Sequence, residues 1–262
     1  MEKNQGLYKK VQGLGSPILM IHGIISDSSF FEDSVSYLSK KYRVITYDRR
    51  SYGKSNRKEY KDYSVHTQAE DAAAILREFC HEPAWIVGNS AGGLIAIELA
   101  LSHPELVRGM ILIEPSLGYE ERERKKLLDW NKELNEYVAA DRIKLALPAF
   151  ARVVGGTSKT NQTTSLNETR QTYQNLSAFM HGELNEVQNY LPPIENLKKL
   201  SMPIVVAVTE EGRQSIFATS SLSGAKMTGW PVEWIPGFHN MAKELPEQFS
   251  EKIFQIVSQY AQ

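Results

Sequence analysis

The residues with the clearest chemical signature are 88–92, which form a Gly-Asn-Ser-Ala-Gly sequence. An apolar run at 83–88 precedes the serine, and an apolar helical pattern at 91–104 follows it. In that setting, small residues on both sides of the serine permit a sharp strand-to-helix turn with the serine exposed at its tip. The pattern predicts that Ser90 is a nucleophile that forms a covalent acyl intermediate.

A serine nucleophile needs N–H donors that stabilise the negative oxygen of the tetrahedral intermediate. The backbone N–H of Ala91 is one candidate, because it lies at the N-terminus of the predicted helix, where the helix dipole favours negative charge. The loop after the first apolar run supplies the second candidate, from Ile24 or Gly23. His22 in the same loop has two interpretations, a hydrogen bond within the loop and a contact with the substrate.

His239 is the predicted general base. It follows Ser90 in the chain and lies in the loop between the last predicted strand, 232–237, and the C-terminal helical pattern, 246–260. Histidine follows serine in the triad order of this kind of strand–serine–helix site. His103 and His181 also follow Ser90, but the first ends a helical pattern and the second lies outside the strand pattern.

The acid that would orient the histidine is missing from its usual place. The loop after the apolar run 203–209 is where that acid is expected, and the register puts the position on Gly212. No aspartate occurs anywhere after Asp141. The acid is therefore a glutamate at another position, or the triad has none.

Three glutamates are candidates for this role: Glu114, Glu210 and Glu211. Glu114 is favoured, because a charged residue directly after the apolar run 107–113 is costly to bury without a partner and His239 would supply one. Glu210 and Glu211 stay open as alternatives. At most one of those two can point toward His239, since a slip of one residue reverses the direction of a strand side chain.

Short apolar runs alternate with longer helical patterns, which predicts an α/β fold with a mostly parallel sheet flanked by helices. The predicted strands are residues 16–23, 42–48, 83–88, 107–115, 203–209 and 232–237. Residues 116–200 break this rhythm with several helical patterns and no strand. We therefore predict a core domain from residues 1–115 and 201–262, and a helical cap from residues 116–200 that lies over the strand ends, where ligands bind in open α/β sheets.

The bulk properties exclude several classes of protein. The chain has 262 residues and a net charge of −1, which favours neither nucleic acid nor an anionic membrane as a partner. One cysteine, Cys80, excludes an internal disulfide framework. No apolar segment at the N-terminus resembles a signal peptide, and no run approaches the ~18 residues of a membrane span. We expect a cytoplasmic protein, and no heptad pattern predicts an oligomer. The mixed charges of residues 120–126 are typical of a solvated helix face.

Taken together, these residues resemble the α/β-hydrolase superfamily across the whole predicted core. Residues 47–55 also resemble that superfamily's loop after the strand that ends at Asp48. The resemblance implies an eight-stranded, mostly parallel sheet, whose first strand is missing or truncated here because the N-terminal segment is short.

A narrower resemblance is to the lactonases that open zearalenone, a macrocyclic resorcylic lactone. Those enzymes place the triad glutamate just after the sixth strand, as Glu114 is placed in Leu-Ile-Glu-Pro-Ser, and the spacing of residues 191–249 is similar to theirs. This resemblance implies Glu114 as the acid. It also puts Phe179 where those enzymes have a cap tryptophan against the lactone.

The sequence thus predicts a hydrolase that cleaves a carboxylic ester or lactone of a small molecule through Ser90, His239 and Glu114, with no metal and no organic cofactor. The same triad also fits a C–C bond hydrolase, an amidase or an acyltransferase, because the pocket alone distinguishes these activities. A non-catalytic receptor for small molecules is the alternative from another class.

Overall fold

The computed structural model describes residues 6–56, 62–154 and 166–260. Its described residues form a seven-stranded sheet in the order β1-β3-β2-β4-β5-β6-β7, and all neighbours are parallel except β1 and β3. The strands are β1 (Lys9–Gln12), β2 (Pro17–Ile21), β3 (Arg43–Tyr47), β4 (Ala84–Asn89), β5 (Val107–Ile113), β6 (Ile204–Thr209) and β7 (Val232–Ile235). The six predicted strands are all present, and the mostly parallel α/β fold is confirmed.

Strand β1 was not predicted from the sequence. It consists of Lys9, Lys10, Val11 and Gln12, none of them buried, and it pairs antiparallel with β3 at the edge of the sheet. Only backbone hydrogen bonds to β3 define it, so no apolar run marks it in the sequence. The implied eight-stranded sheet is therefore one strand shorter in the described residues.

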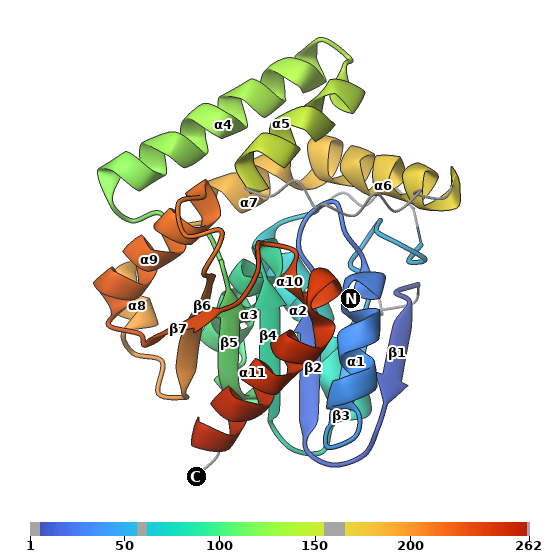
Figure 1. The fold of residues 1–262 in the computed structure, drawn as a ribbon, viewed down its shortest axis with the longest axis vertical. Helices are drawn as coiled ribbons and strands as arrows, with labels where there is room; N and C mark the ends of the chain where they lie inside the picture. The colour runs from blue at the N-terminus through green and yellow to red at the C-terminus, as the bar shows by residue number, and fades with distance from the viewer. Residues whose placement is uncertain (1–5, 57–61, 155–165, 261–262) are drawn as a thin grey trace.

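Helices cover both faces of the sheet (Figure 1). Helices α1 (Glu32–Leu38) and α11 (Pro246–Tyr260) pack on one face, and α2 (Val65–Phe79) and α3 (Ala91–Ser102) pack on the other. Alternate residues of β2 face opposite layers, with Ile18 and Met20 toward α1 and α11, and Leu19 and Ile21 toward α2 and α3. Both faces are apolar, as expected for buried parallel strands.

The shorter elements join these layers. The 3₁₀ turns are η1 (Ser28–Phe31) and η2 (Pro104–Leu106), and the helices that follow β6 and β7 are α9 (Ile216–Thr228) and α10 (Met241–Glu244). Within the described residues, no helix is long and apolar enough to cross a membrane.

In the described part of the chain, all elements between β5 and β6 are helical. They are α4 (Glu121–Ala139), η3 (Ile143–Leu145), α5 (Ala146–Val154), α6 (Leu166–Ala178), the π-helical turn η4 (Phe179–Glu183), α7 (Leu184–Asn189) and α8 (Ile194–Leu197). Helices α4 to α7 lie across the end of the sheet where the parallel strands finish (Figure 1). They share an apolar cluster that includes Trp130, Phe150 and Phe179. We call residues 116–200 the cap segment; its residues 155–165 lie outside the described part.

Candidate active site

Ser90 lies at the turn between β4 and α3 and has a strained backbone. Its φ of 52° and ψ of −122° fall outside the regions that residues with a side chain usually occupy. The turn is also tight, since a Cβ on Gly92 would lie 2.1 Å from the carbonyl oxygen of Ile21. The Ser90 N–H donates to the carbonyl of Ile113, the last residue of β5, at 2.8 Å. Ser90 is thereby held beside the end of β5, where Glu114 follows.

Glu114 is fully buried, and both of its carboxylate oxygens are hydrogen-bonded. Oε2 lies 2.5 Å from Nδ1 of His239, while Oε1 accepts from the Thr209 N–H at 3.0 Å and from the Thr209 hydroxyl at 2.6 Å. Burial raises the pKa of Glu114, but the hydrogen bond and charge of His239 and the two bonds from Thr209 outweigh it, so the pKa lies below its ordinary value. The structure brings Glu114 and His239 together in the way expected of a triad acid and base.

The alternative glutamates point elsewhere. Glu210 and Glu211 are both exposed, and Oε2 of Glu211 accepts from the Gly237 N–H at 2.5 Å. A Cβ on Gly212 would lie only 2.3 Å from Oγ1 of Thr209, the hydroxyl that holds Glu114. The position where the sequence register expected the acid therefore has to stay without a side chain if Thr209 is to bind Glu114.

His239 lies in the loop between β7 and α10 and is 7% exposed. Its ring stacks on Phe217, with 4.6 Å between centroids, and Phe217 also lines the cavity that contains Ser90. Because Nδ1 is directed to Glu114, Nε2 is the ring nitrogen left for Ser90 or a substrate. Neither Nε2 nor Oγ of Ser90 hydrogen-bonds to a described residue, and such catalytic contacts commonly tighten only when substrate is bound.

The loop after β2 presents a backbone N–H near Ser90. The Gly23 carbonyl lies 2.8 Å from Nδ1 of His22 and accepts from Nη2 of Arg49 at 2.9 Å. Nε2 of His22 accepts from the Arg49 N–H at 3.0 Å, so the proton of a neutral ring is on Nδ1. Burial and the charge of Arg49 lower the pKa of His22 to about 3, which keeps the ring neutral. Since N–H and C=O point to opposite sides of a trans peptide, this arrangement turns the Ile24 N–H away from Arg49.

A buried network joins this loop to the cap segment. Arg49 and Glu183 form an ion pair in which both side chains are almost completely buried. Gln68 bonds to both partners, at 2.6 Å to Arg49 and 2.9 Å to Glu183, and the Tyr52 hydroxyl donates to Glu183. The carboxylate of Glu183 comes from η4 in the cap segment, while Arg49 follows β3 in the core. One guanidinium thus connects the cap segment to the carbonyl of Gly23.

A small cavity of about 20 Å³ lies beside Ser90, with room for about one water molecule. The residues that line it are Ile24, Ser90, Ala91, Leu94, Ser116, Arg124, Leu127, Trp130, Val187, Gln188, Tyr190 and Phe217. Ile24 and Ala91, two of the three candidate oxyanion donors, therefore line the same cavity as Ser90, and Gly23 does not line it. In this conformation the cavity is too small for a substrate larger than water.

Two predicted substrate contacts are not at this cavity. His22 is fully buried, and both of its ring nitrogens contact backbone, which corresponds to the loop interpretation. Phe179 is also fully buried, with its ring 5.6 Å from that of Phe150 inside the cap cluster.

The interpretation of residues 120–126 as a solvated helix face is wrong for part of this segment, because Arg124 lines the cavity and Glu123 is buried. One side of α4 packs inward onto the core.

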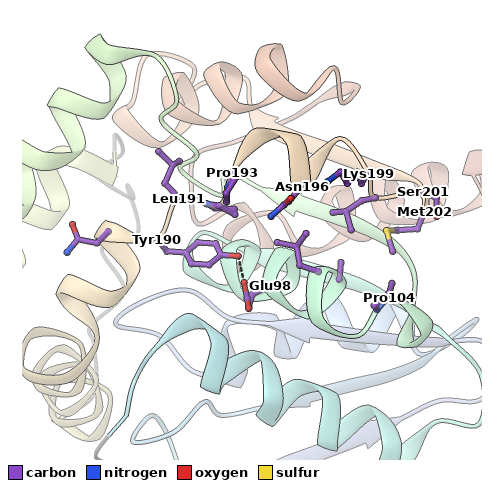
Figure 2. A pocket seen from close by; sticks show the side chains of 14 residues that line it. Glu98, Pro104, Tyr190, Leu191, Pro193, Asn196, Lys199, Ser201 and Met202 are labelled. Atoms are coloured by element: carbon purple, nitrogen blue, oxygen red, sulfur yellow. Dashed lines mark hydrogen bonds between the residues drawn. The ribbon is translucent and has the colours of Figure 1, made fainter.

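A second, open groove of about 780 Å³ lies between α3 and residues 189–202 (Figure 2). The Tyr190 hydroxyl donates to Oε2 of Glu98 at 2.8 Å within it, as the dashed line shows. Tyr190 also lines the small cavity, so its side chain is common to the open groove and the closed site.

Sequence reasoning missed Arg124, Arg49, Glu183 and Gln188. Each is a polar residue whose role depends on which helix packs over which strand end, and no local pattern marks it.

Among the described residues, no group of three or more His, Cys, Asp or Glu side chains could hold a metal ion.

Comparisons with known proteins agree with this architecture. Residues 16–211 match a family model described as the alpha/beta hydrolase fold. An uncharacterized hydrolase of Bacillus subtilis, YraK, is 26% identical over 261 residues, which cover 96% of this chain and 92% of that protein. A thermophilic esterase from Thermogutta terrifontis has a similar structure, with a TM-score of 0.78, 18% identity, and coverage of 97% of this chain and 93% of that one. Est816, described as an N-acyl homoserine lactone degrading enzyme, has a TM-score of 0.73 and 20% identity, with coverage of 95% and 96%.

Proposed function

Since the chain belongs to the α/β hydrolase fold family, we propose that it is a serine hydrolase that cleaves a carboxylic ester or lactone of a small molecule. The single observation that carries this proposal is the buried Glu114–His239 pair beside the end of β5, where Ser90 is also anchored. A buried acid that orients a histidine next to a strained serine is the arrangement needed for nucleophilic acyl transfer.

In the proposed reaction, Oγ of Ser90 attacks the acyl carbon while Nε2 of His239 takes its proton. The N–H groups of Ala91 and Ile24 stabilise the oxyanion, and they act strongly because the cavity has room for little water. His239 then protonates the leaving alkoxide. In the second half of the reaction it removes a proton from water, whose oxygen attacks the acyl carbon. His239 then returns that proton to Oγ of Ser90 as the acyl–oxygen bond breaks, which releases the carboxylic acid and the free serine.

Glu114 keeps the Nδ1 proton of His239 in place and stabilises the imidazolium that forms in both halves of the reaction. The lowered pKa of Glu114 supports this role, because the carboxylate is then ionised at neutral pH. Thr209 supplies the two hydrogen bonds that fix the carboxylate, and Gly212 leaves the space for Thr209.

Two similarities support ester or lactone substrates. The Thermogutta terrifontis protein is named an esterase, and Est816 is described as degrading a lactone. The narrower resemblance to zearalenone-opening lactonases stays a prediction that rests on Glu114. Phe179, which that resemblance places against the lactone, is buried in the cap cluster in this conformation.

The test is steady-state hydrolysis by the purified protein of p-nitrophenyl acetate, p-nitrophenyl octanoate and a macrocyclic resorcylic lactone, with Ser90→Ala as the blank. We expect turnover of at least one of them that disappears in the blank. Lactone opening would support the narrower resemblance, and cleavage of simple esters alone would support a general esterase. Absence of any Ser90-dependent hydrolysis would contradict the proposal and favour a C–C bond hydrolase or a small-molecule receptor.

A further inference from the structure

The cap side of the cavity beside Ser90 carries three side chains with N–H donors: Arg124 on α4, Trp130 on α4 and Gln188 on α7. We call these three residues the donor wall. Among the described residues that line the cavity, Arg124 is the one charged residue, and none is acidic. The donor wall faces the nucleophile across a space from which water is nearly excluded.

The positive charge of Arg124 has no acidic partner among the described residues. Its Nη1 donates to the backbone carbonyl of Gln188 at 3.0 Å, which uses one of the five N–H donors of the guanidinium. Two neighbouring acidic residues pair with other cations, Glu120 with Lys226 at 2.5 Å and Glu123 with Lys126 at 2.9 Å, and Glu121 at the start of α4 forms no ion pair with Arg124. Arg124 therefore brings an unneutralised charge to the cavity.

The other two members also have unused donors. Trp130 is 4% exposed, and its Nε1 is buried without a hydrogen-bond partner among the described residues. Gln188 is 7% exposed, and its side-chain amide makes no hydrogen bond to a described residue. Leaving buried donors unsatisfied is unfavourable, so native proteins usually pair them. Nε1 of Trp130 is thus a buried donor that lacks a protein partner, and it belongs to the same wall as the unneutralised guanidinium of Arg124. Together these two groups indicate a place where a ligand with acceptor oxygens would be stabilised.

We propose that the donor wall binds a carboxylate of the substrate, which makes the enzyme selective for esters or lactones that carry a free carboxylate. This inference rests on the proposed function and narrows its substrate class. The guanidinium fork matches a carboxylate with two parallel hydrogen bonds. One unneutralised cation balances one negative charge, which favours a carboxylate over a doubly charged phosphate. The competing explanation is that Arg124 only binds the C-terminal carbonyl of α7.

The experiment compares two esters of equal chain length, mono(4-nitrophenyl) adipate and 4-nitrophenyl hexanoate, which differ by the free carboxylate. Rates are measured in the wild type, Arg124→Gln and Arg124→Lys, with spontaneous hydrolysis subtracted by the Ser90→Ala blank. Arg122→Gln is the matched control, because Arg122 lies on the same helix and its side chain is 84% exposed.

We expect the wild type to prefer the adipate ester by about 10- to 100-fold in kcat/KM, the range of a charge-assisted hydrogen bond that is fully desolvated. Arg124→Gln should abolish this preference, chiefly through KM, and Arg124→Lys should keep part of it, while Arg122→Gln retains it. A wild type without preference, or an adipate-to-hexanoate ratio that Arg124→Gln leaves unchanged, would overturn the proposal and leave Arg124 with its contact to α7 alone.

A binding measurement separates this inference from the proposed hydrolysis. Monomethyl adipate is titrated calorimetrically into Ser90→Ala and into the Ser90→Ala, Arg124→Gln double variant. Binding that is lost in the double variant supports the donor wall even if neither nitrophenyl ester is cleaved, an outcome that would defeat the hydrolase proposal by itself. Equal binding by the two proteins, or none by either, contradicts the donor wall.

Discussion

The strand ends and the cap segment meet around Ser90, but they differ in how far their polar side chains are hydrogen-bonded within the protein. At the strand ends, both oxygens of Glu114 and both ring nitrogens of His22 already have partners. On the cap side, Arg124 and Trp130 bring donors to the cavity that the described residues do not satisfy. In the proposed enzyme, the groups that orient the histidine and the loop after β2 are thus paired before substrate arrives, whereas the proposed recognition side is left for substrate to complete. Preorganisation is most useful where charge develops during the reaction.

The two regions are joined by a buried ion pair. Arg49 of the core and Glu183 of the cap segment are both nearly inaccessible to solvent, and Arg49 also holds the carbonyl of Gly23. The cap segment therefore contributes to the orientation of the loop that presents the Ile24 N–H. Replacing Arg49 or Glu183 therefore tests whether the cap segment affects the loop after β2.

The largest expected effect is that of Glu114→Gln. The amide cannot stabilise an imidazolium, so we expect kcat to fall about 10³- to 10⁴-fold, the size of effect seen when a triad acid becomes an amide. The far-UV circular dichroism spectrum should stay that of the wild type. Turnover is measured on whichever ester the wild type cleaves best.

Glu210→Gln is the matched control for that prediction, because Glu210 follows β6 in the same region but is exposed. Its kcat should remain within about twofold of the wild type, as expected for an exposed group away from special contacts. If Glu210→Gln loses activity and Glu114→Gln keeps it, the acid is misassigned and the strand ends are not preorganised as described.

The second prediction concerns the connection between the regions. Glu183→Gln leaves the Arg49 charge buried without its partner, which should lower the free energy of unfolding by about 3–5 kcal/mol. Urea unfolding followed by circular dichroism measures this. Asp129→Asn is the control, since it removes an ion pair with Lys125 on the exposed side of α4 and should cost at most about 0.5 kcal/mol.

A double replacement sharpens the same test. Arg49→Met combined with Glu183→Met removes both charges, and a buried ion pair replaced by apolar residues is often neutral for stability. The Gly23 carbonyl then loses one of its two donors. We expect stability to recover only in part, because Gln68 and the Tyr52 hydroxyl lose their bonds to the pair, while kcat stays reduced by about 10-fold, the value of a hydrogen bond to a charged group. Recovery of both would mean that the network holds the cap segment in place without positioning the oxyanion loop.

The two regions also differ in how far sequence predicts them. Ser90, His239 and Glu114 each lie directly after a strand or in the loop that leaves one, so the apolar runs that define the strands also locate the candidate catalytic side chains. Ile24 and Ala91 also come soon after strands, and for the same reason the sequence places them at the cavity.

The cap residues could not be located in this way. Arg124 stands in a run of mixed charges, and only the packing of α4 over the sheet makes it differ from its exposed neighbour Arg122. Phe179 is an aromatic residue of the kind that often contacts a ligand, but the π-helical turn buries it against Phe150. These outcomes depend on contacts between helices that are distant in the chain, which local patterns do not encode.

The third prediction tests why the usual acid position is empty. A Cβ at residue 212 would come within 2.3 Å of Oγ1 of Thr209, so Gly212→Ala should displace the hydroxyl from Glu114. We expect kcat to fall about 10-fold, the value of a hydrogen bond to a charged group. Gly229→Ala is the comparison variant: its strain comes from a φ of +80° and not from a contact, so it should lower stability and leave kcat unchanged. Full activity in Gly212→Ala would show that Thr209 does not need that space.

The smallest expected effect is a pH dependence of stability. The pKa of Glu114 is lower in the folded protein than its ordinary value of 4.5, because His239 and Thr209 bind the ionised form more strongly than burial opposes it. A lowered folded-state pKa means that the unfolded chain binds the proton more readily, so the ionised carboxylate stabilises the fold above pH 4.5. This contribution is lost as the pH falls through the folded-state value. The difference in unfolding free energy between the wild type and Glu114→Gln, measured with urea at neutral pH and in acid, should therefore shrink toward low pH. A difference that grows in acid would mean that Glu114 is protonated in the fold, and the carboxyl would then lack the charge partner that the strand-end site is expected to supply.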